Sequence, residues 1–357
     1  MTDTAIDERV EGAIARGAVV AMSLSGGKDS TAAAYAASQI LDAAGHPRSR
    51  RIAVHADLGR AEWRETPATV AAIAATLELP LHVVRQTRHD LVGRWHDRFE
   101  RGLARYAALE TLCLIGPWSS AKLRFCTSEA KASVITRFLR SQFAGQEVIS
   151  VIGIRRAESP ARRLTPISAI DPRLTDRAGT TGLIWHPLVD WSAPEVFALH
   201  DAAALPLHVA YTTYGSSRLS CAACVLASKH DLEASASCAG NAELFGTLID
   251  LEARSTFSFQ PGRWLADVAG TVLNPRQQSA IALAKERATE RRRLEDELPR
   301  GLRYVAGWPQ RLPEPGEAAD IARVRSAIAD HHALDTPYRT ATTVRDRFAE
   351  LLASRPH

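Results

Sequence analysis

The sequence contains no apolar run long enough to cross a bilayer and no secretory signal at its beginning. A membrane-spanning helix needs about 20 consecutive apolar residues, whereas this chain opens with the polar stretch Met-Thr-Asp-Thr-Ala-Ile-Asp-Glu. That opening lacks the apolar core of a signal peptide. We therefore expect a cytoplasmic protein with no membrane partner.

Cysteine is scarce, and neither sign of charge dominates. Five cysteines in 357 residues argue against a disulfide framework in a cytosolic chain and favour metal binding or catalysis. The net charge of +4, from 44 basic and 40 acidic residues, is too small to indicate nucleic-acid binding by itself. The sequence has no internal repeat and no low-complexity segment. Its composition, 46% hydrophobic and 24% charged, is that of a globular protein.

One glycine-rich turn stands out near the N-terminus. Val19 to Ser23 predicts a short apolar strand. Ser25-Gly26-Gly27-Lys28-Asp29-Ser30 follows as a turn, and an alanine-rich helix continues to about Leu41. Two glycines permit backbone angles that gather N–H groups into a concave nest, and a helix N-terminus favours an anion. The turn therefore predicts a phosphate site.

The polar side chains of this turn support the same interpretation. Ser23, Ser25 and Ser30 supply hydroxyl groups, and Lys28 supplies a positive charge. Asp29 fits an anion site when a magnesium ion lies between its carboxylate and the phosphates. The alternative is an ordinary strand-to-helix turn in which an Asp or Ser is the N-cap.

The first half of the chain alternates strands and helices. We expect strands at 51–55, 81–85 and 147–152, helices at 5–16, 66–77 and 128–142, a charged outer helix at 88–112 and a loop at 164–182. The β-α-β-α-β order predicts an α/β fold with a doubly wound, mainly parallel sheet that binds ligands at the carboxyl ends of its strands. Asp57 follows the second strand and would lie at that edge.

We expect three parts in the chain. Residues 1–195 would form the α/β domain, residues 196–250 a cysteine-containing segment packed on it, and residues 251–357 a mainly helical region with proline-rich breaks near 309–315. The basic segment from Lys285 to Arg293 is a candidate for DNA binding. Glutamates are interspersed in it, which favours a solvated helix instead.

The turn at Ser25 resembles a known phosphate loop. It does not fit the Walker pattern, which needs four residues between its glycines. Ser25-Gly26-Gly27-Lys28-Asp29-Ser30 resembles the PP-loop of the ATP pyrophosphatase superfamily. The resemblance implies that the loop grips the β and γ phosphates of ATP and that pyrophosphate is released while AMP is transferred.

Later segments resemble, in the same order, the phosphoadenosine phosphosulfate (PAPS) reductase branch of that superfamily. The matching residues are Asp57, Gly59, Glu65 and Thr66, then Lys122, Arg124, Cys126, Thr127 and Lys131, then Gly153, Arg155, Glu158, Ser159 and Arg162, then Pro187, Leu188, Asp190 and Trp191, and finally Tyr211, Gly215 and Arg218. Leu58 departs from the pattern, in which threonine is usual. Arginine binds phosphate and sulfate oxygens in a bidentate manner, so the resemblance implies a polyanionic ligand.

Four cysteines form a candidate metal site. Cys221 and Cys224 are a CxxC pair, with Cys126 upstream and Cys238 downstream. A CxxC alone is compatible with a redox pair, half a zinc site or part of an iron–sulfur site. Four thiolates match the ligand count of a Cys₄ site, and the ligands do not distinguish iron from zinc. Cys113 lies in an apolar stretch and is expected to be buried structure.

The cysteines also separate the branches of the family. PAPS and adenylyl-sulfate reductases carry a reactive cysteine in a C-terminal tail, and this sequence has no cysteine after Cys238. The chain instead resembles the DndC- and SspD-type sulfur-transfer proteins of DNA phosphorothioation, which combine an ATP pyrophosphatase domain with a [4Fe–4S] cluster. This resemblance implies ATP, Mg²⁺ and a [4Fe–4S] cluster as cofactors. It also implies a cysteine desulfurase as sulfur donor and DNA, or a DNA-modification complex, as acceptor.

The same resemblance assigns roles to residues. The expected catalytic residues are Lys28, Asp29, Arg155 and Arg218. The residues expected to bind the nucleotide are Ser23, Ser25, Gly26, Gly27, Lys28, Asp29, Ser30, Asp57, Gly153, Arg155 and Arg162. The cluster is expected to be held by Cys126, Cys221, Cys224 and Cys238, and Mg²⁺ by Asp29. The implied activity is adenylation of an acceptor followed by sulfur insertion. The rivals are sulfur transfer to a tRNA base or small molecule, and a sulfonucleotide reductase or nucleotide-binding regulator that performs no adenylation.

Overall fold

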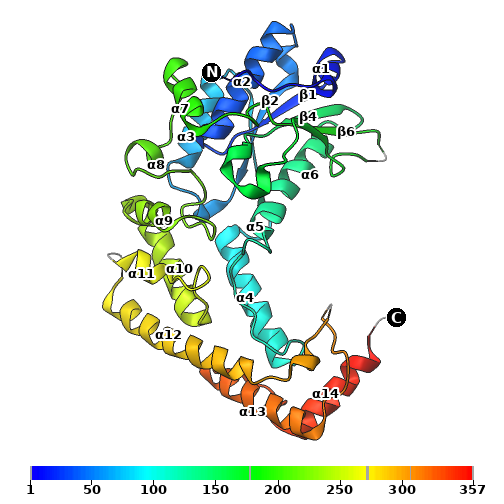
Figure 1. Cartoon of the computed structure of the whole chain (residues 1–357), viewed down its shortest axis with the longest axis vertical. Helices are drawn as coiled ribbons and strands as arrows, with labels where there is room; N and C mark the ends of the chain where they lie inside the picture. Colours follow the sequence, from blue (N-terminus) through cyan, green and yellow to red (C-terminus); the bar gives the residue numbers. More distant parts are fainter. Residues whose placement is uncertain (1, 177, 271–272, 306, 356–357) are drawn as a thin grey trace. The chain divides into compact units, whose positions relative to one another are not determined.

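The computed structural model describes residues 2–176, 178–270, 273–305 and 307–355 (Figure 1). The chain divides into two compact units: a sheet unit, Met1–Leu91 with Ala121–Asn241, and a helical unit, Val92–Ser120 with Ala242–His357. The boundaries expected after residues 195 and 250 do not coincide with this division. The cysteine-bearing segment as far as Asn241 belongs to the sheet unit, and residues 92–120 belong with the C-terminal helices.

Six strands form one sheet in the sheet unit, in the order β3-β2-β1-β4-β6-β5. They are β1 (Val19–Ser23), β2 (Arg51–Asp57), β3 (Leu81–Arg85), β4 (Glu147–Val151), β5 (Ser168–Ile170) and β6 (Thr181–Trp185). Neighbouring strands are parallel except at one edge, where β5 runs antiparallel to β6. This order confirms the α/β fold with a doubly wound, mainly parallel sheet.

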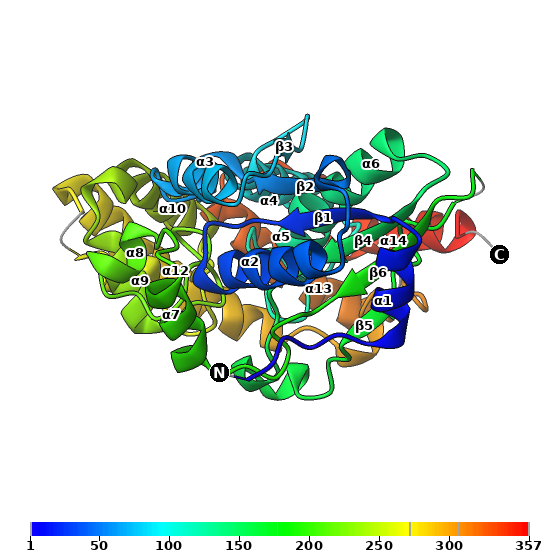
Figure 2. The ribbon, with the colours of Figure 1, turned by 90° about the horizontal axis from the view of Figure 1, so that it is seen from above.

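Both faces of the sheet are covered by helices. Val20 and Met22 of β1 belong to one core with residues of α1 (Glu8–Ala15), α2 (Lys28–Ala43), α3 (Thr66–Thr76) and α7 (Ala193–Ala202). Val19 and Ala21 belong to a second core with residues of α6 (Ser133–Gln142). Figure 2 shows α2 and α6 on opposite sides of the sheet. Burial of both faces explains why these strands are continuous apolar runs.

The connections diverge on the two sides of β1. From β1 the chain passes through α2 to β2 and then to β3, whereas β4 pairs with the other edge of β1. Doubly wound folds bind ligands where the connections diverge, outside the carboxyl ends of the strands. The glycine-rich turn after β1 and the turn at Gly153 after β4 both lie there.

The segment 164–182, expected to be a loop, contains strand structure. It includes all of β5, and β6 begins at Thr181. Proline, aspartate and glycine favour turns, so the composition of this segment predicted a loop where the structure has two short strands. Gly182 stands in β6 because a Cβ at this position would lie 2.4 Å from the Cβ of Leu174. A glycine that signals a turn in the sequence is thus required by close packing.

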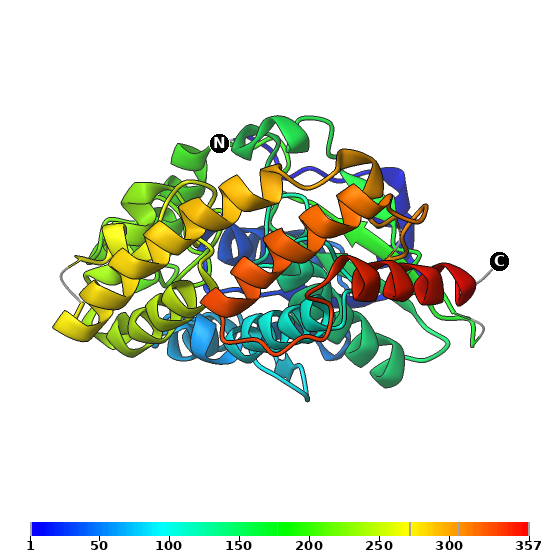
Figure 3. The same cartoon turned by 90° about the horizontal axis from the view of Figure 1, so that it is seen from below.

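The helical unit is built from helices, as expected for residues 251–357. They are α4 (Leu91–Ala107, which begins at the last residue of the sheet unit), α10 (Ala242–Ser255), α11 (Leu265–Val268), α12 (Pro275–Asp296), α13 (Pro315–His331) and α14 (Ala341–Ala353). Figure 3 shows α12 and α13 side by side. In the described parts of the chain, no helix has the length and apolar character needed to span a membrane.

Helix α4 lies in the core of the helical unit and is not the outer helix that its charges predicted. Trp95, Phe99 and Tyr106 are fully buried. The ring of Trp95 packs edge-on against Trp118 and Phe259, with ring centres 5.6 and 6.1 Å apart. The charged residues occupy the rest of the surface of this amphipathic helix. The number of charged residues in this helix predicted an exposed position, whereas the spacing of its apolar residues defines a buried face.

Cys113 is exposed, which corrects the expectation of a buried thiol. Helix α4 ends at Ala107, so the segment around Cys113 is not helical. Leu112 and Leu114 are buried on either side of it. The chain bends at Leu112 and Cys113, and this bend leaves the cysteine on the surface between the two buried leucines.

The basic segment Lys285–Arg293 lies on α12, and each of its basic side chains bonds a carboxylate or a backbone carbonyl within the helical unit. Arg293 forms ion pairs with Glu290 of the same helix and with Glu297, the residue that follows the helix. Arg291 is buried, pairs with Glu295 at 3.0 Å and lies over the ring of Phe257. These contacts favour a structural role for the segment over DNA binding.

Candidate functional site

The turn between β1 and α2 is braced by its own serines. Gly26 has a φ of +76°, a conformation that glycine adopts without strain. The Oγ atoms of Ser25 and Ser30 are 3.1 Å apart, and Ser30 Oγ donates a hydrogen bond to the carbonyl of Gly27 at 2.9 Å. These bonds fix the shape of what we call the phosphate loop, residues 25–30.

The first turn of α2 has backbone N–H groups that are not hydrogen-bonded, among the residues that the structure describes. In the described part of the chain, no acceptor is bonded to the backbone N–H of Asp29 or Ser30. The helical pattern begins at Thr31, whose N–H donates to the carbonyl of Gly27 at 3.1 Å. Unpaired N–H groups and the helix dipole together attract an anion. The phosphate loop therefore presents the donors that a phosphate group needs.

Asp29 lies between two cations at this loop. Its carboxylate accepts hydrogen bonds from Arg155 Nε at 2.6 Å and from Lys28 Nζ at 3.0 Å. Lys28 is 3% exposed, and its ammonium group lies 5.5 Å from the ring centre of Phe197 and 5.3 Å from that of Tyr211. Low solvent exposure strengthens charge interactions of this kind. The three charged groups are therefore held in fixed positions.

Gly153 packs directly on the backbone of the phosphate loop. A Cβ at this position would lie 2.3 Å from the carbonyl oxygen of Asp29 and 2.7 Å from the backbone nitrogen of Ser30. No side chain fits at such distances. The turn after β4 approaches the loop because residue 153 is glycine, and this approach carries Arg155 to the carboxylate of Asp29.

Four arginines predicted from the sequence gather around the loop. Burial lowers the pKa of Arg162, and three neighbouring guanidinium groups lower it further: those of Arg124, Arg218 and Arg155. The Asp29 carboxylate acts on the same group in the opposite direction. Glu158 and Asp29 offset part of this charge through ion pairs with Arg155 and Arg162. Four guanidinium groups against two carboxylates still leave an excess of positive charge, which favours a polyanionic ligand. The structure thus brings together residues that are up to 94 positions apart in the sequence, from Arg124 to Arg218.

A cavity of about 150 Å³ opens beside the phosphate loop. Its apolar wall includes Val54, Ala56 and Leu58, from β2 and the following residue, and Ile135 from α6. Its polar wall includes Ser23, Ser25 and Cys221. Mostly apolar cavities with a few polar groups are typical of sites for small organic ligands, and the position next to a phosphate loop suits a nucleoside.

Asp57 is not among the residues that form this cavity. Its Oδ1 accepts a hydrogen bond from the N–H of Gly59 at 2.7 Å, which closes the turn after β2. Gly59 has a φ of +64°. The observed role of Asp57 is therefore the capping of a turn, and nucleotide binding by Asp57 stays a prediction.

Two ionisable residues that line the cavity, His55 and Glu62, were not predicted as site residues from the sequence. His55 Nδ1 lies 2.9 Å from the carbonyl oxygen of Leu24, and Nε2 lies 3.3 Å from Glu62. Burial lowers the pKa of His55, but the hydrogen bond and charge of Glu62 outweigh it, so the pKa is raised. The place of His55 near the end of a buried strand could have identified it. Glu62 gives no such signal because it follows in an irregular segment.

Three of the four predicted cysteine ligands lie near one another. Burial raises the pKa of the Cys221 thiol to about 12, Lys131 lowers it, and the neighbouring Cys224 and Cys126 thiols raise it further. The Sγ atom of Cys224 accepts a hydrogen bond from the N–H of Leu226 at 3.4 Å. The CxxC segment and the start of the helical stretch at Phe125–Thr127 thus meet beside the cavity.

Cys238 has a different environment. It is 1% exposed, and its thiol lies beside the Tyr214 hydroxyl and raises the pKa of that tyrosine. Among the described residues, no three His, Cys, Asp or Glu side chains are arranged to hold a metal ion as they stand. Cys126 and Cys224 are thus near enough to Cys221 to affect the pKa of its thiol, while Cys238 lies beside Tyr214, and the four cysteines do not form a preassembled metal site.

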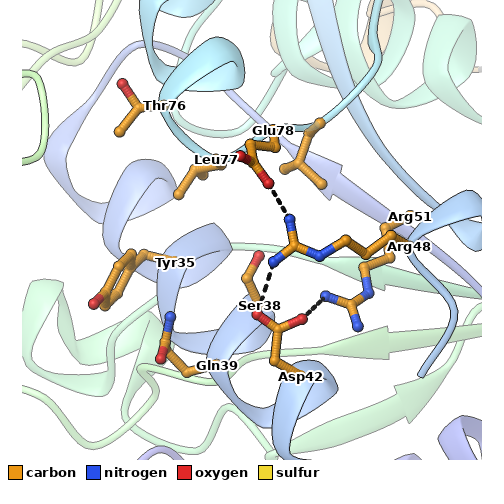
Figure 4. A pocket seen from close by; sticks show the side chains of 10 residues that line it. Tyr35, Ser38, Gln39, Asp42, Arg48, Arg51, Thr76, Leu77 and Glu78 are labelled. Carbon is orange, nitrogen blue, oxygen red and sulfur yellow. Dashed lines mark hydrogen bonds and ion pairs between the residues drawn. The ribbon is translucent and has the colours of Figure 1, made fainter. Parts of the chain in front are cut away.

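A second cavity, of about 230 Å³, lies at the other end of α2. Figure 4 shows the Arg48 guanidinium between Glu78 and Asp42, with Arg51 also bonded to Asp42. Two guanidinium groups face two carboxylates, so the charges balance within the group. None of the predicted site residues lines this cavity, which leaves the phosphate loop as the candidate site.

The segment that contains this site matches a known protein family. Residues 19–227 match the family described as the phosphoadenosine phosphosulfate reductase domain, a range that holds the phosphate loop, the four arginines and the CxxC pair. A PAPS reductase from Candida auris, solved as a phosphate complex, has 13% sequence identity and a TM-score of 0.36 over 62% of this chain and 98% of its own. No curated protein matches the sequence. Because the match spans more than half of the residues, the chain belongs to the phosphoadenosine phosphosulfate reductase domain family.

Proposed function

We propose that the chain is an ATP pyrophosphatase that adenylates an acceptor for sulfur insertion, with the DNA backbone as the favoured acceptor. The observation that carries this proposal is the phosphate loop, where open N–H groups, Lys28 and Asp29 stand at one helix N-terminus. Family membership supports a sulfonucleotide-related or sulfur-transfer enzyme in general terms. The resemblance of the cysteines to DndC- and SspD-type proteins supports the choice of DNA.

In this proposal, different residues of the site bind different parts of ATP. The β and γ phosphates bind the N–H groups of Asp29 and Ser30 beside Lys28, and the adenosine occupies the cavity next to the loop. Arg155 and Arg218 stabilise the charge that develops on the departing pyrophosphate. Preorganised positive charge is the main contribution of a protein to such a transfer.

The proposed reaction has two displacements. An acceptor oxygen attacks the α-phosphorus of ATP, the bond to the β-phosphate oxygen breaks, and pyrophosphate leaves with the bonding electrons. The acceptor oxygen now carries AMP, which is a good leaving group. The terminal sulfur of a persulfide on a cysteine desulfurase partner then attacks the acceptor, and AMP leaves with the acceptor oxygen. A thiol reductant cleaves the resulting S–S bond and becomes a disulfide, so the acceptor has exchanged an oxygen for a sulfur.

The residues at the loop fit a magnesium ion. Mg²⁺ is usually bound by one or two carboxylates together with substrate phosphates, and Asp29 is the carboxylate at this loop. Both of its oxygens bond cations, but a carboxylate oxygen has a second lone pair for a metal. When bound, Mg²⁺ would neutralise phosphate charge next to Asp29.

A [4Fe–4S] cluster would be held by Cys126, Cys221 and Cys224, with Cys238 as the fourth ligand. Thiolates suit iron or zinc, and an N–H bond to sulfur, as at Cys224, is one of the features that tune such clusters. Cys238 interacts with Tyr214 and not with the other three thiols, so an experiment must decide whether it is the fourth ligand. When bound, the cluster would supply a site for sulfur or electrons beside the nucleotide.

The products of ATP cleavage test the proposed function. Purified protein with ATP and Mg²⁺ should form AMP and pyrophosphate in equal amounts, slowly without an acceptor, as measured by nucleotide chromatography and a pyrophosphate assay. Adding a cysteine desulfurase, cysteine and DNA should accelerate the release of AMP. Acceleration by tRNA and not by DNA would support the rival acceptor. ADP and orthophosphate would contradict the assignment, because they arise by breaking a different bond.

The iron content tests the cluster. Protein purified without oxygen should be brown and hold about four irons per chain if the cluster is cubane. Serine at position 126, 221 or 224 should remove most of the iron, and Cys238→Ser decides the fourth ligand. Cys113→Ser is the control, because Cys113 belongs to the helical unit. Colourless protein with one zinc per chain would overturn the iron assignment.

Family membership also favours a second candidate, a sulfonucleotide reductase. Such an enzyme attacks sulfur with a cysteine and leaves ATP intact. Release of sulfite from phosphoadenylyl sulfate, with no formation of AMP from ATP, would establish it. The intact Lys28–Asp29 pair at the loop weighs against this candidate.

A further inference from the structure

The hydroxyl group of Tyr211 joins two loops that are far apart in the sequence. Tyr211 lies on α8 (Val209–Thr212). Its oxygen accepts a hydrogen bond from the N–H of Lys28 at 3.3 Å and another from the N–H of Leu219 at 2.8 Å. Lys28 is the first residue of α2, and Leu219 lies two residues before Cys221. One hydroxyl group therefore contacts both the phosphate loop and the segment that carries the CxxC pair.

Residues 215–224, which we call the cysteine loop, lie directly on the phosphate loop. Side-chain atoms of Leu219 lie 3.4 Å from a Cβ placed at Gly26 and 3.5 Å from one placed at Gly27. The cysteine loop also carries Arg218, one of the arginines gathered around Asp29. A displacement of Leu219 would therefore move Arg218 and Cys221 relative to the phosphate loop.

Other contacts anchor the cysteine loop on both sides of Leu219. The N–H of Ser217 donates to Asp231 at 2.7 Å, and the N–H of Ala222 donates to the carbonyl of Ala61 at 2.8 Å. Between these anchors, Tyr211 is the acceptor for Leu219. Loss of the Tyr211 hydroxyl should therefore loosen the middle of the loop and leave its ends in place.

The bond to Lys28 makes Tyr211 sensitive to a ligand in the phosphate loop. The N–H of Lys28 belongs to the first turn of α2, where a bound phosphate also seeks N–H donors. A phosphate oxygen and the tyrosine oxygen would compete for this hydrogen. Burial raises the pKa of Tyr211 to about 12, so the hydroxyl stays protonated and can turn its own hydrogen toward an incoming phosphate.

We propose that Tyr211 is a positioning residue that holds the cysteine loop over the phosphate loop and transmits the occupancy of the phosphate loop to Arg218 and Cys221. The transmission rests on the proposed function, because it needs a phosphate at the loop. The holding of the cysteine loop does not, because it follows from the bonds to Lys28 and Leu219 alone.

Hydrogen–deuterium exchange of the purified full chain tests both parts, with Tyr211→Phe as the variant. Phenylalanine keeps the ring against Phe197 and Lys28 and removes the oxygen. Without nucleotide, peptides covering 216–222 should exchange about fivefold faster in the variant, the effect of one lost hydrogen bond. With ATP and Mg²⁺, the exchange of peptides covering 25–31 should become slower in both proteins. The exchange rate of peptides covering 216–222 should change on addition of ATP only in the unmodified protein.

Tyr35→Phe is the matched control, because Tyr35 lines the cavity at the other end of α2 and should leave both peptides unchanged. Equal exchange of 216–222 in the unmodified protein and in Tyr211→Phe, without nucleotide, would overturn the positioning role. An equal response of 216–222 to ATP in both would overturn the transmission. If ATP protects 25–31 in neither protein, the proposed function and the transmission both fail, while the comparison without nucleotide still decides the positioning role.

Discussion

Replacing Lys28 with alanine is expected to lower the rate of ATP cleavage by a factor of about 100 to 1,000, the usual effect of removing one group that stabilises developing charge. The ammonium group is buried beside Asp29 and between the rings of Phe197 and Tyr211. Water cannot replace it efficiently in such a site. The measurement is the initial rate of AMP formation at saturating ATP and Mg²⁺.

Lys229→Ala is the control for the Lys28 variant. Lys229 begins α9 (Lys229–Ala236) in the same unit, its side chain is 61% exposed, and it pairs with Glu233 one turn away. The variant removes the same charge and should keep the full rate. Equal rates for Lys28→Ala and the unmodified protein, with both folded by circular dichroism, would show that the phosphate loop does not act on ATP.

Replacing Gly153 with alanine is expected to lower the same rate by about 100-fold, because displacement of a catalytic group by about 1 Å has effects of this size. The new methyl group would lie 2.3 Å from the carbonyl oxygen of Asp29, so the turn or the loop must move. Either movement separates Arg155 from the Asp29 carboxylate. The free energy of unfolding should fall by about 1 to 3 kcal/mol, as for other overpacked sites.

Gly316→Ala is the matched control for the Gly153 variant. Gly316 lies near the start of α13, and a Cβ there meets no atom within 4 Å. This variant should keep both the rate and the melting temperature. A Gly153→Ala protein with normal activity would mean that the contact between Gly153 and Asp29 has no importance for catalysis.

The parts of the fold that were predictable are those whose signal is local. β1 and β3 occupy the residues expected for them, because an apolar run between turn residues needs no information from elsewhere. The sequence did not predict strands β5 and β6. The glycine at position 182 is required by close packing against Leu174, and only the tertiary structure shows this contact. The assignment of residues 92–120 to the helical unit likewise depends on packing partners more than 100 residues away, such as Phe259.

The candidate site shows the same division. The phosphate loop is one contiguous segment, so its chemistry can be inferred from the sequence. The arginines came from the order of the family motifs, since scattered arginines carry no signal of their own. Tyr211 was visible only as a motif position, and its bonds to Lys28 and Leu219 required the fold.

The helical unit is assembled from an insertion and a C-terminal extension, and this affects how the protein can be shortened. Stopping the chain at Asn241 would remove Phe259 and the other late partners of α4 but keep α4 itself. The rings of Trp95, Phe99 and Tyr106 would then face water, a patch that promotes aggregation. A minimal version of the sheet unit therefore needs two cuts: removal of the C-terminal helices, and excision of residues 92–120 with a short linker from Leu91 to Ala121.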